Sequence, residues 1–139
     1  TVLQVAAPYW FLYEGTPGGR LDLEGGYIVR SDGRRTPLAE RWDELLPRPR
    51  WLYFGSSETE RVIYFVHHEN GEVMDSFWPM QGDMTVFGFG RLHLNRYLTQ
   101  TPARFTIGLA ESGDYAKAAS VIYSATQPLG ITVGKPEAI

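Results

Sequence analysis

The residues of this sequence that are best suited to chemistry lie within 61–91, where two adjacent histidines are followed by the acids Glu69 and Asp75. A histidine and a carboxylate within hydrogen-bonding reach can act as an acid/base pair. If the protein is an enzyme, a small glycan-active hydrolase or lyase, its catalytic residues are expected among His67, His68, Glu69 and Asp75. The ordinary alternative is an interior histidine beside one that caps a strand end. No catalytic motif is complete, so we assign no catalytic residue and do not favour an enzyme.

Metal ligands are a second kind of chemistry that this stretch could supply. Adjacent strand residues point to opposite faces of a sheet, so His67 and His68 cannot readily bind one metal ion. The segment from Glu69 to Asp75 offers oxygen ligands of the kind calcium prefers, but their spacing fits no complete calcium loop. The chain has no cysteine, which excludes a cysteine-ligated zinc site and a thiol nucleophile. We predict no metal site and no cofactor, with calcium left open.

Aromatic residues are the third resource, because they make up 14% of the chain and include four tryptophans. A sugar ring presents an apolar face of C–H groups above a polar rim, and an indole ring with polar neighbours matches both. Any single aromatic residue is more often part of a core. The surplus favours noncatalytic binding of a polysaccharide or oligosaccharide. The predicted ligand-binding residues are three stacking rings and three polar anchors: Trp51, Tyr53, Trp78, His67, Asp75 and Arg91.

Strands must position most of these side chains. The run from Arg61 to His68 is largely apolar on both alternating faces, which is typical of a central strand covered on both sides. Further strands are expected at 51–54, 73–80, 84–91, 103–110 and 129–133. The clearest helix is Ser112–Ala125, with Ser112 as its N-cap. Residues 36–50 lose their periodicity and are expected to form a loop. Arg91 has a structural alternative, an internal ion pair with Asp75.

The short turns between these strands favour antiparallel pairing. We therefore predict a mainly β fold, an antiparallel β-sandwich or jelly roll with one helix near 112–125. The alternative is an α+β fold in which the helix covers one face of a bent antiparallel sheet.

Length, charge and hydropathy limit the classes of function. A chain of 139 residues is the size of one domain, 1–139, and because it begins at Thr1 it could have been excised from a larger protein. A net charge of −3 argues against nucleic acid as a partner. No apolar run is long enough to span a bilayer. The oligomeric state is not predicted.

Two segments carry a resemblance to a known family: YFVHHENGEVMDSFWPM at 64–80 and MTVFGFGR at 84–91. They are similar to segments of concanavalin A-like sandwich domains of large bacterial secreted proteins, mainly over residues 51–110. Many of those proteins act on polysaccharides or accompany enzymes that do. The resemblance therefore implies a secreted or extracellular protein with a carbohydrate partner, and it transfers no catalytic residue. The chain is short for a full domain of this kind. A third hypothesis is a structural or interaction domain of a larger assembly.

Overall fold

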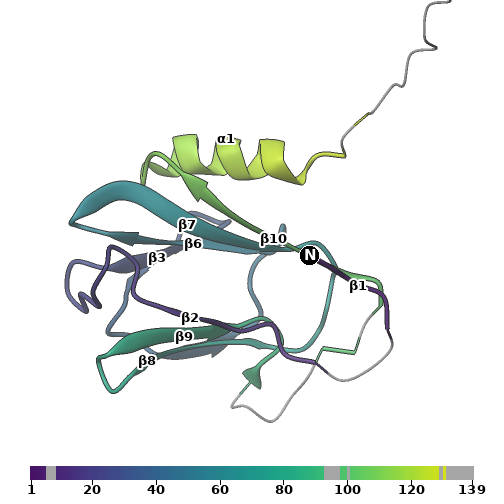
Figure 1. Cartoon of the computed structure of the whole chain (residues 1–139), viewed down its shortest axis with the longest axis horizontal. Helices are drawn as coiled ribbons and strands as arrows, with labels where there is room; N and C mark the ends of the chain where they lie inside the picture. Colours follow the sequence, from purple (N-terminus) through teal and green to yellow (C-terminus); the bar gives the residue numbers. More distant parts are fainter. Residues whose placement is uncertain (6–8, 93–97, 100, 129, 131–139) are drawn as a thin grey trace, which may run out of the picture.

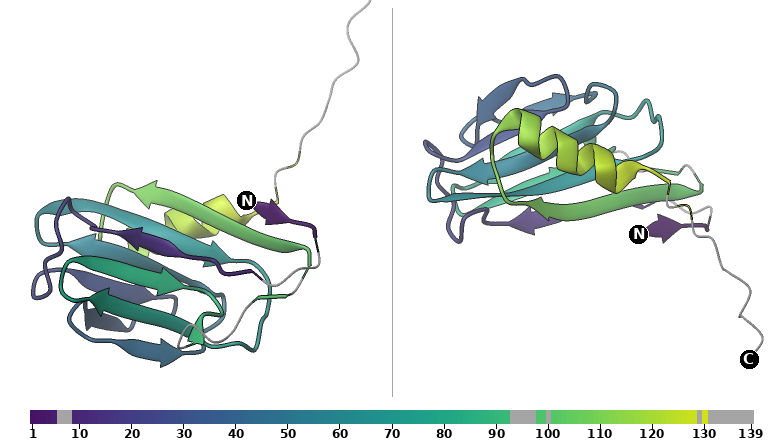
Figure 2. Two further views of the ribbon diagram at one scale, coloured as in Figure 1. Left: turned by 60° about the horizontal axis from the view of Figure 1, so that its bottom comes forward. Right: turned by 90° about the horizontal axis from the view of Figure 1, so that it is seen from above.

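Two antiparallel sheets lie face to face in the computed structural model, and a helix packs on the outside of the larger sheet (Figures 1 and 2). The structure describes residues 1–5, 9–92, 98–99, 101–128 and 130. The prediction of a mainly β sandwich with a helix is confirmed. Apart from Gly130, the predicted strand at 129–133 lies outside the described residues.

The larger sheet has six strands in the described chain, in the order β1-β10-β7-β6-β3-β4. Their bounds in that order are Val2–Leu3, Ala103–Ala110, Thr59–His67, Trp51–Ser56, Tyr27–Arg30 and Arg35–Pro37. The smaller sheet has four, in the order β2-β9-β8-β5. Their bounds are Tyr13–Gly15, Met84–Gly88, Asp75–Met80 and Trp42–Glu44. Every neighbouring pair is antiparallel, as the short turns predicted.

Two local predictions are wrong. The helix α1 (Tyr115–Thr126) is capped by Asp114, whose side chain accepts a hydrogen bond from the backbone N–H of Lys117, and not by Ser112. The segment 36–50 was expected to be a loop but contains β5. That strand exists because Trp42 to Glu44 pair with Phe77 to Asp75 of β8. A three-residue strand is specified by its partner far along the chain, which local periodicity does not reveal.

The core between the two sheets is built from phenylalanine rings. It contains six buried phenylalanines, three from the larger sheet and three from β8 and β9 and the residues after them: Phe54, Phe65, Phe105, Phe77, Phe87 and Phe89. Rings of this size release about 1.5–3 kcal/mol each when they leave water. Most ring pairs are tilted or edge-on, as for Phe54 and Phe65, which is the favoured arrangement of aromatic neighbours.

A second core lies between the larger sheet and α1. It is formed on the sheet side by Trp51, Tyr53 and Val66 and on the helix side by Ala118 and Ile122. Both faces of β6 and β7 are thus covered, one by the smaller sheet and the other by α1, which explains their apolar alternation on both sides. Among the described residues there is no helix with the length and hydropathy needed to cross a bilayer.

Candidate functional site

Trp51 and Tyr53, two of the predicted stacking rings, are sealed beneath α1. Their exposed fractions are 6% and 1%. The Trp51 ring stacks on Tyr53 and on Tyr115 of the helix, with centroids 6.4 and 6.2 Å apart. The Tyr53 hydroxyl donates to the carbonyl of Gly113 at 3.0 Å, and burial raises the pKa of Tyr53 to about 12. The predicted stacking role is not supported, because neither ring offers a face to a ligand; both hold the helix on the sheet.

Asp75, a predicted polar anchor, is fully buried as part of an ion pair. Arg50 Nη2 donates to Asp75 Oδ1 at 2.6 Å and to Oδ2 at 2.8 Å. The backbone N–H groups of Leu46 and Gly90 donate to the same carboxylate. Burial raises the pKa of Asp75, and Arg50 and the two backbone donors oppose that shift. The carboxylate therefore joins three chain segments inside the protein, and its arginine partner is Arg50 rather than the predicted Arg91.

His67, another predicted anchor, lies inside the sandwich. Its ring is 2% exposed and stacks on Phe105, with centroids 4.9 Å apart and planes at 15°. Desolvation lowers the pKa of His67 to about 4, so the ring is neutral at pH 7. Among the described residues, neither ring nitrogen has a hydrogen-bond partner. An uncharged imidazole with aromatic neighbours is a core residue rather than an anchor for a ligand in solvent.

The histidines and acids proposed as acid/base pairs do not form a hydrogen-bonded pair between His67 and Glu69. His67 Nε2 lies 3.9 Å from Glu69 Oε2, which is beyond hydrogen-bonding distance. Glu69 instead accepts from the backbone N–H of Arg104 at 2.6 Å and from its Nε at 2.7 Å. His68 faces the other side of the sheet and shares a hydrogen bond of 2.8 Å with Thr106 Oγ1. The carboxylate nearest His67 is therefore occupied by an arginine.

The histidines and acids of 67–75 are not arranged as a metal site. In the part of the chain that the structure describes, no three His, Asp or Glu side chains come together as ligands for an ion. Glu69 and Asp75, the predicted oxygen ligands for calcium, are each paired with an arginine.

Trp78 and Arg91, the two remaining predicted residues, lie on the outer face of the smaller sheet. Phe77 and Phe87 point into the core, so by alternation Trp78 and Gly88 point outward. Arg91 covers Gly88, where an added Cβ would lie only 2.7 Å from Arg91 Cδ. The guanidinium carbon of Arg91 is 4.9 Å from the centroid of the Trp10 ring, a cation–π contact. Burial lowers the pKa of Arg91, and the nearby carboxylate of Glu14 opposes this.

A second indole–guanidinium pair lies on the same face. Arg41 stands over the Trp78 ring with its guanidinium carbon 5.6 Å from the centroid. Trp78 is half-buried and Trp10 is 38% exposed, whereas Trp51 is sealed. Trp78 lies opposite Val86 of β9, and Val86 lies opposite Glu14 of β2. We call this surface the indole face and define it by five residues: Trp10, Glu14, Arg41, Trp78 and Arg91.

Sequence reasoning missed Arg41 and Glu14. Each has an aromatic neighbour in the sequence, Tyr13 before Glu14 and Trp42 after Arg41. That neighbour does not place either residue on this face, which each joins only through sheet pairing and the fold of the preceding loop. The outward alternation of residues 10, 12 and 14 was the one signal that could have placed Glu14 beside Trp10.

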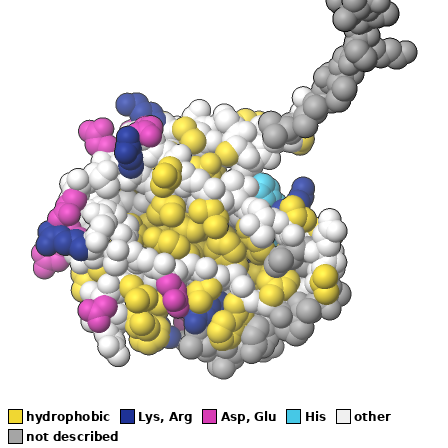
Figure 3. Space-filling view, in the orientation of Figure 1, with side chains coloured by type: hydrophobic (Ala, Val, Ile, Leu, Met, Phe, Trp, Pro, Cys, Tyr) yellow, Lys and Arg dark blue, Asp and Glu magenta, His cyan; other side chains and the backbone are white. Residues whose placement is uncertain are grey.

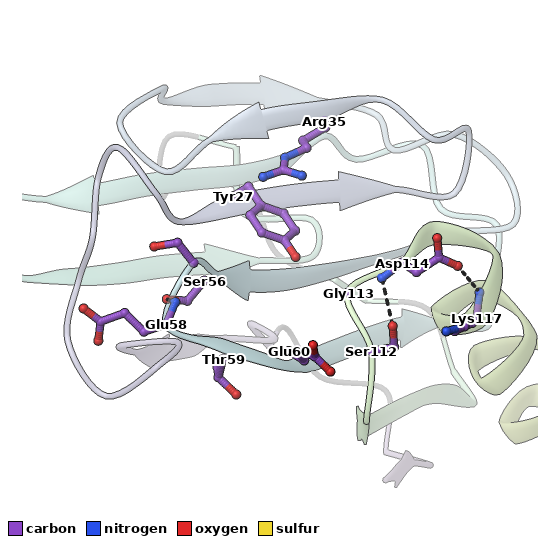
Figure 4. Close-up of a pocket in the computed structure, with 11 residues that line it drawn as sticks. Tyr27, Arg35, Ser56, Glu58, Thr59, Glu60, Ser112, Gly113, Asp114 and Lys117 are labelled. Atoms are coloured by element: carbon purple, nitrogen blue, oxygen red, sulfur yellow. Dashed lines mark hydrogen bonds between the residues drawn. The ribbon is translucent and has the colours of Figure 1, made fainter.

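A polar hollow lies away from the indole face, and its lining comes from the larger sheet and the start of α1 (Figure 4). It measures about 530 Å³ and lies between the β6–β7 turn and the start of α1. In it Ser112 Oγ accepts from the N–H of Asp114, and Asp114 Oδ1 accepts from the N–H of Lys117 (dashed in Figure 4). Its one aromatic ring, Tyr27, is covered by the Arg35 guanidinium at 3.6 Å. This polar hollow offers hydrogen bonds, and its ring is covered more closely than the two indoles, whose guanidinium carbons lie 4.9 and 5.6 Å from the ring centroids.

A smaller hollow of about 280 Å³ lies at the last turn of α1. It does bring together three predicted residues, Trp51, His67 and His68, with helix residues on the opposite wall. The buried rings of Trp51 and His67 contribute little open surface there.

Comparison of the chain with protein-family models, with curated proteins and with solved structures found no match.

Proposed function

We propose that this protein is a noncatalytic carbohydrate-binding domain and that the indole face stacks on the sugar rings of a polysaccharide. The observation that carries the proposal is the pairing of each outward indole with a guanidinium on one sheet face: Trp78 with Arg41, and Trp10 with Arg91. The two rings that sequence patterning had favoured for stacking, Trp51 and Tyr53, have no part in it, since they pack beneath α1.

The chemistry of the indole face matches both parts of a sugar. An indole accepts the apolar C–H face of a pyranose, and a guanidinium donates to hydroxyl or carboxylate oxygens at its rim. Arg41 is exposed and suits this donor role, whereas Arg91 is only 8% exposed and mainly supports the Trp10 ring. Because β9 separates β8 from β2, Trp78 and the Trp10 segment are two strand spacings apart, about 10 Å. A single sugar ring cannot cover both indoles, so the ligand that uses the whole face is an oligomer. A secreted or extracellular location belongs to the same proposal, because a protein outside the cell has access to structural polysaccharides.

Affinity electrophoresis against soluble neutral and uronate-containing polysaccharides tests the proposal. We expect Trp78→Ala and Trp10→Ala each to weaken binding about tenfold or more, since burying an aromatic ring is worth about 1.5–3 kcal/mol. Tyr123→Ala is the matched control, because Tyr123 is an exposed aromatic residue on α1 at the far side of the molecule. Retardation by no polysaccharide would reject the function.

The polar hollow is the second arm of this experiment. If a double variant Glu60→Gln, Lys117→Met abolished retardation while Trp78→Ala and Trp10→Ala did not, carbohydrate binding would stand and the indole face would be the wrong location. The polar hollow is lined by acids, bases and hydroxyl groups, which suits a ligand rich in hydroxyl groups.

The two other hypotheses lack a comparable observation. A hydrolase using His67 requires a base that reaches substrate, and this ring is buried beside Phe105. The hypothesis of an interaction domain of a larger assembly concerns a different surface, the edge of β10, which is described below.

A further inference from the structure

The strand β10 has a long edge that the described chain leaves open. One side of β10 pairs with β7 from Phe105 to Ala110. The other side pairs with β1, but only through Ala103 and Arg104. Within the described residues, no strand pairs with the outer edge beyond Phe105.

The open part of this edge is apolar. Ile107 is 55% and Leu109 is 67% exposed, although both point to the same side as the buried Phe105. The facing edge of the smaller sheet is β2, which is only three residues long and does not cover them. The sandwich is therefore open here, with a hollow of about 430 Å³ that reaches Phe54 and Ile63. Figure 3 shows hydrophobic side chains gathered in the middle of this side, between the edges of the two sheets.

The backbone of the open edge continues an existing ladder. The N–H of Phe105 donates to the carbonyl of Thr1, and the amino group of Thr1 donates to the carbonyl of Phe105, both at 2.9 Å. In an antiparallel ladder every second residue directs its N–H and C=O to the same side. Ile107 and Leu109 therefore present their backbone groups outward, in line with β1.

Natural sheets usually block such edges. Lysine, proline, inward charges or bulges prevent a further strand from pairing. The open segment, Thr106 to Ala110, reads TIGLA and carries none of these residues. Its register with β7 is regular from Phe105 to Ala110, with no bulge. This edge therefore lacks the features that prevent another strand from pairing with it.

We propose that the outer edge of β10 binds an extended peptide strand of a partner protein, antiparallel to β10 and continuing the line of β1. The peptide places apolar residues opposite Ile107 and Leu109, where they close the open side of the sandwich core. Continuity with the β1–β10 ladder sets both the direction and the register of the added strand. Such strand addition gains affinity from main-chain hydrogen bonds and specificity from alternate side chains. The site is separate from the indole face and does not depend on the proposed carbohydrate binding.

A synthetic peptide of sequence KTVTVTVK serves as the probe, with hydrogen exchange of the full chain read by NMR. We expect the peptide to slow exchange at the amides of Ile107 and Leu109. The amides of Thr106 and Gly108 face β7 and should not change. Ile107→Lys and Leu109→Lys should remove the effect, whereas Val121→Lys, which changes an exposed apolar residue of α1, should retain it.

Two N-methylated peptides separate strand addition from simple hydrophobic contact. In the proposed register the valines of the peptide lie opposite Ile107 and Leu109 and exchange backbone hydrogen bonds with them. Methyl groups on the valine amides should therefore weaken binding at least about tenfold. Methyl groups on the threonine amides point away from β10 and should change binding less than about threefold. Equal losses for the two peptides, or no slowing at Ile107 with millimolar peptide, would overturn the proposal.

Two other occupants are distinguishable in the same experiment. A dimer in light scattering that Leu109→Lys dissociates would identify a second copy of the chain as the occupant, contrary to the proposal. Protected Ile107 and Leu109 amides in the absence of peptide, made labile by removing residues 129–139, would identify the chain's own last segment and would also overturn it.

Discussion

The guanidinium of Arg50 and the carboxylate of Asp75 form an ion pair inside the protein, with Nη2 2.6 and 2.8 Å from the two carboxylate oxygens. Arg50 directly precedes β6 of the larger sheet, and Asp75 begins β8 of the smaller sheet. The pair therefore joins the two layers of the sandwich at one end. Both side chains are almost completely buried, so neither charge has water as an alternative partner.

Breaking this pair should destabilise the fold strongly. We expect Asp75→Asn or Arg50→Met to lower the free energy of unfolding by about 3–5 kcal/mol, because each leaves a buried charge without its partner. The double variant Arg50→Met, Asp75→Leu should lose less than the sum of single variants, since it leaves no buried charge. Urea unfolding measures all of these. Single variants within 0.5 kcal/mol of the parent protein, roughly the scatter of surface substitutions, would contradict a structural role.

The buried imidazole of His67 should make stability depend on pH. Its pKa falls from 6.5 to about 4 on folding, so the unfolded chain binds the proton more tightly. Stability is then fully present above pH 6.5 and declines as the pH falls toward 4. By linkage, this one group should lower the free energy of unfolding by about 2 kcal/mol when the pH falls from 8 to 5.

The contribution of His67 is isolated by a difference between two proteins. The free energy of unfolding of the parent minus that of His67→Phe, measured by urea titration at pH 5 and pH 8, should carry this slope. Other titrating groups are common to both proteins and cancel. A difference that does not change with pH would mean that folding does not shift the pKa of His67.

Gly113 is required by close approach to Tyr27. A methyl group at position 113 would overlap the Tyr27 hydroxyl oxygen, while the next atom of that ring lies 3.6 Å away. We expect Gly113→Ala to destabilise the protein by about 1–3 kcal/mol, as overpacking does. Tyr27→Phe removes the clashing atom, so in that background the same substitution should cost much less. Thermal melts of the four proteins test this, and an equal cost in both backgrounds would refute it.

The four tryptophans should differ in access to solvent. Acrylamide quenching should fall in Trp10→Phe and Trp78→Phe, which remove indoles that reach the surface, and should persist in Trp51→Phe. Trp51→Ala is expected to cost about 3–5 kcal/mol, because it leaves a cavity beneath α1. A Trp51 that is readily quenched would mean that α1 does not cover β6 in solution.

Much of the scaffold was determined by local pattern. The alternation of apolar residues from Arg61 to His68 predicted a strand covered on both sides, and β7 lies between the smaller sheet and α1. The apolar stripe after Ser112 predicted a helix, and α1 extends from Tyr115 to Thr126. Side-chain period follows from backbone geometry over a few residues, so it can be read directly from the chain.

The candidate site could be predicted only in part. Trp78 and Arg91 were selected from the sequence and lie on the indole face, but Trp51 and Tyr53 carried the same aromatic signal and are sealed. Whether a ring on a strand faces a helix or solvent depends on what packs over that face, and periodicity is the same in both cases.

By itself, the sequence determined the type and approximate position of the longest elements, because hydrophobic period and turn residues act locally. Only the tertiary structure decided that Asp75 pairs with Arg50 rather than Arg91, that β5 forms within 36–50, and that β10 keeps an open edge. Each of these depends on which distant segments become neighbours, and that is a property of long-range packing rather than of the residues on either side.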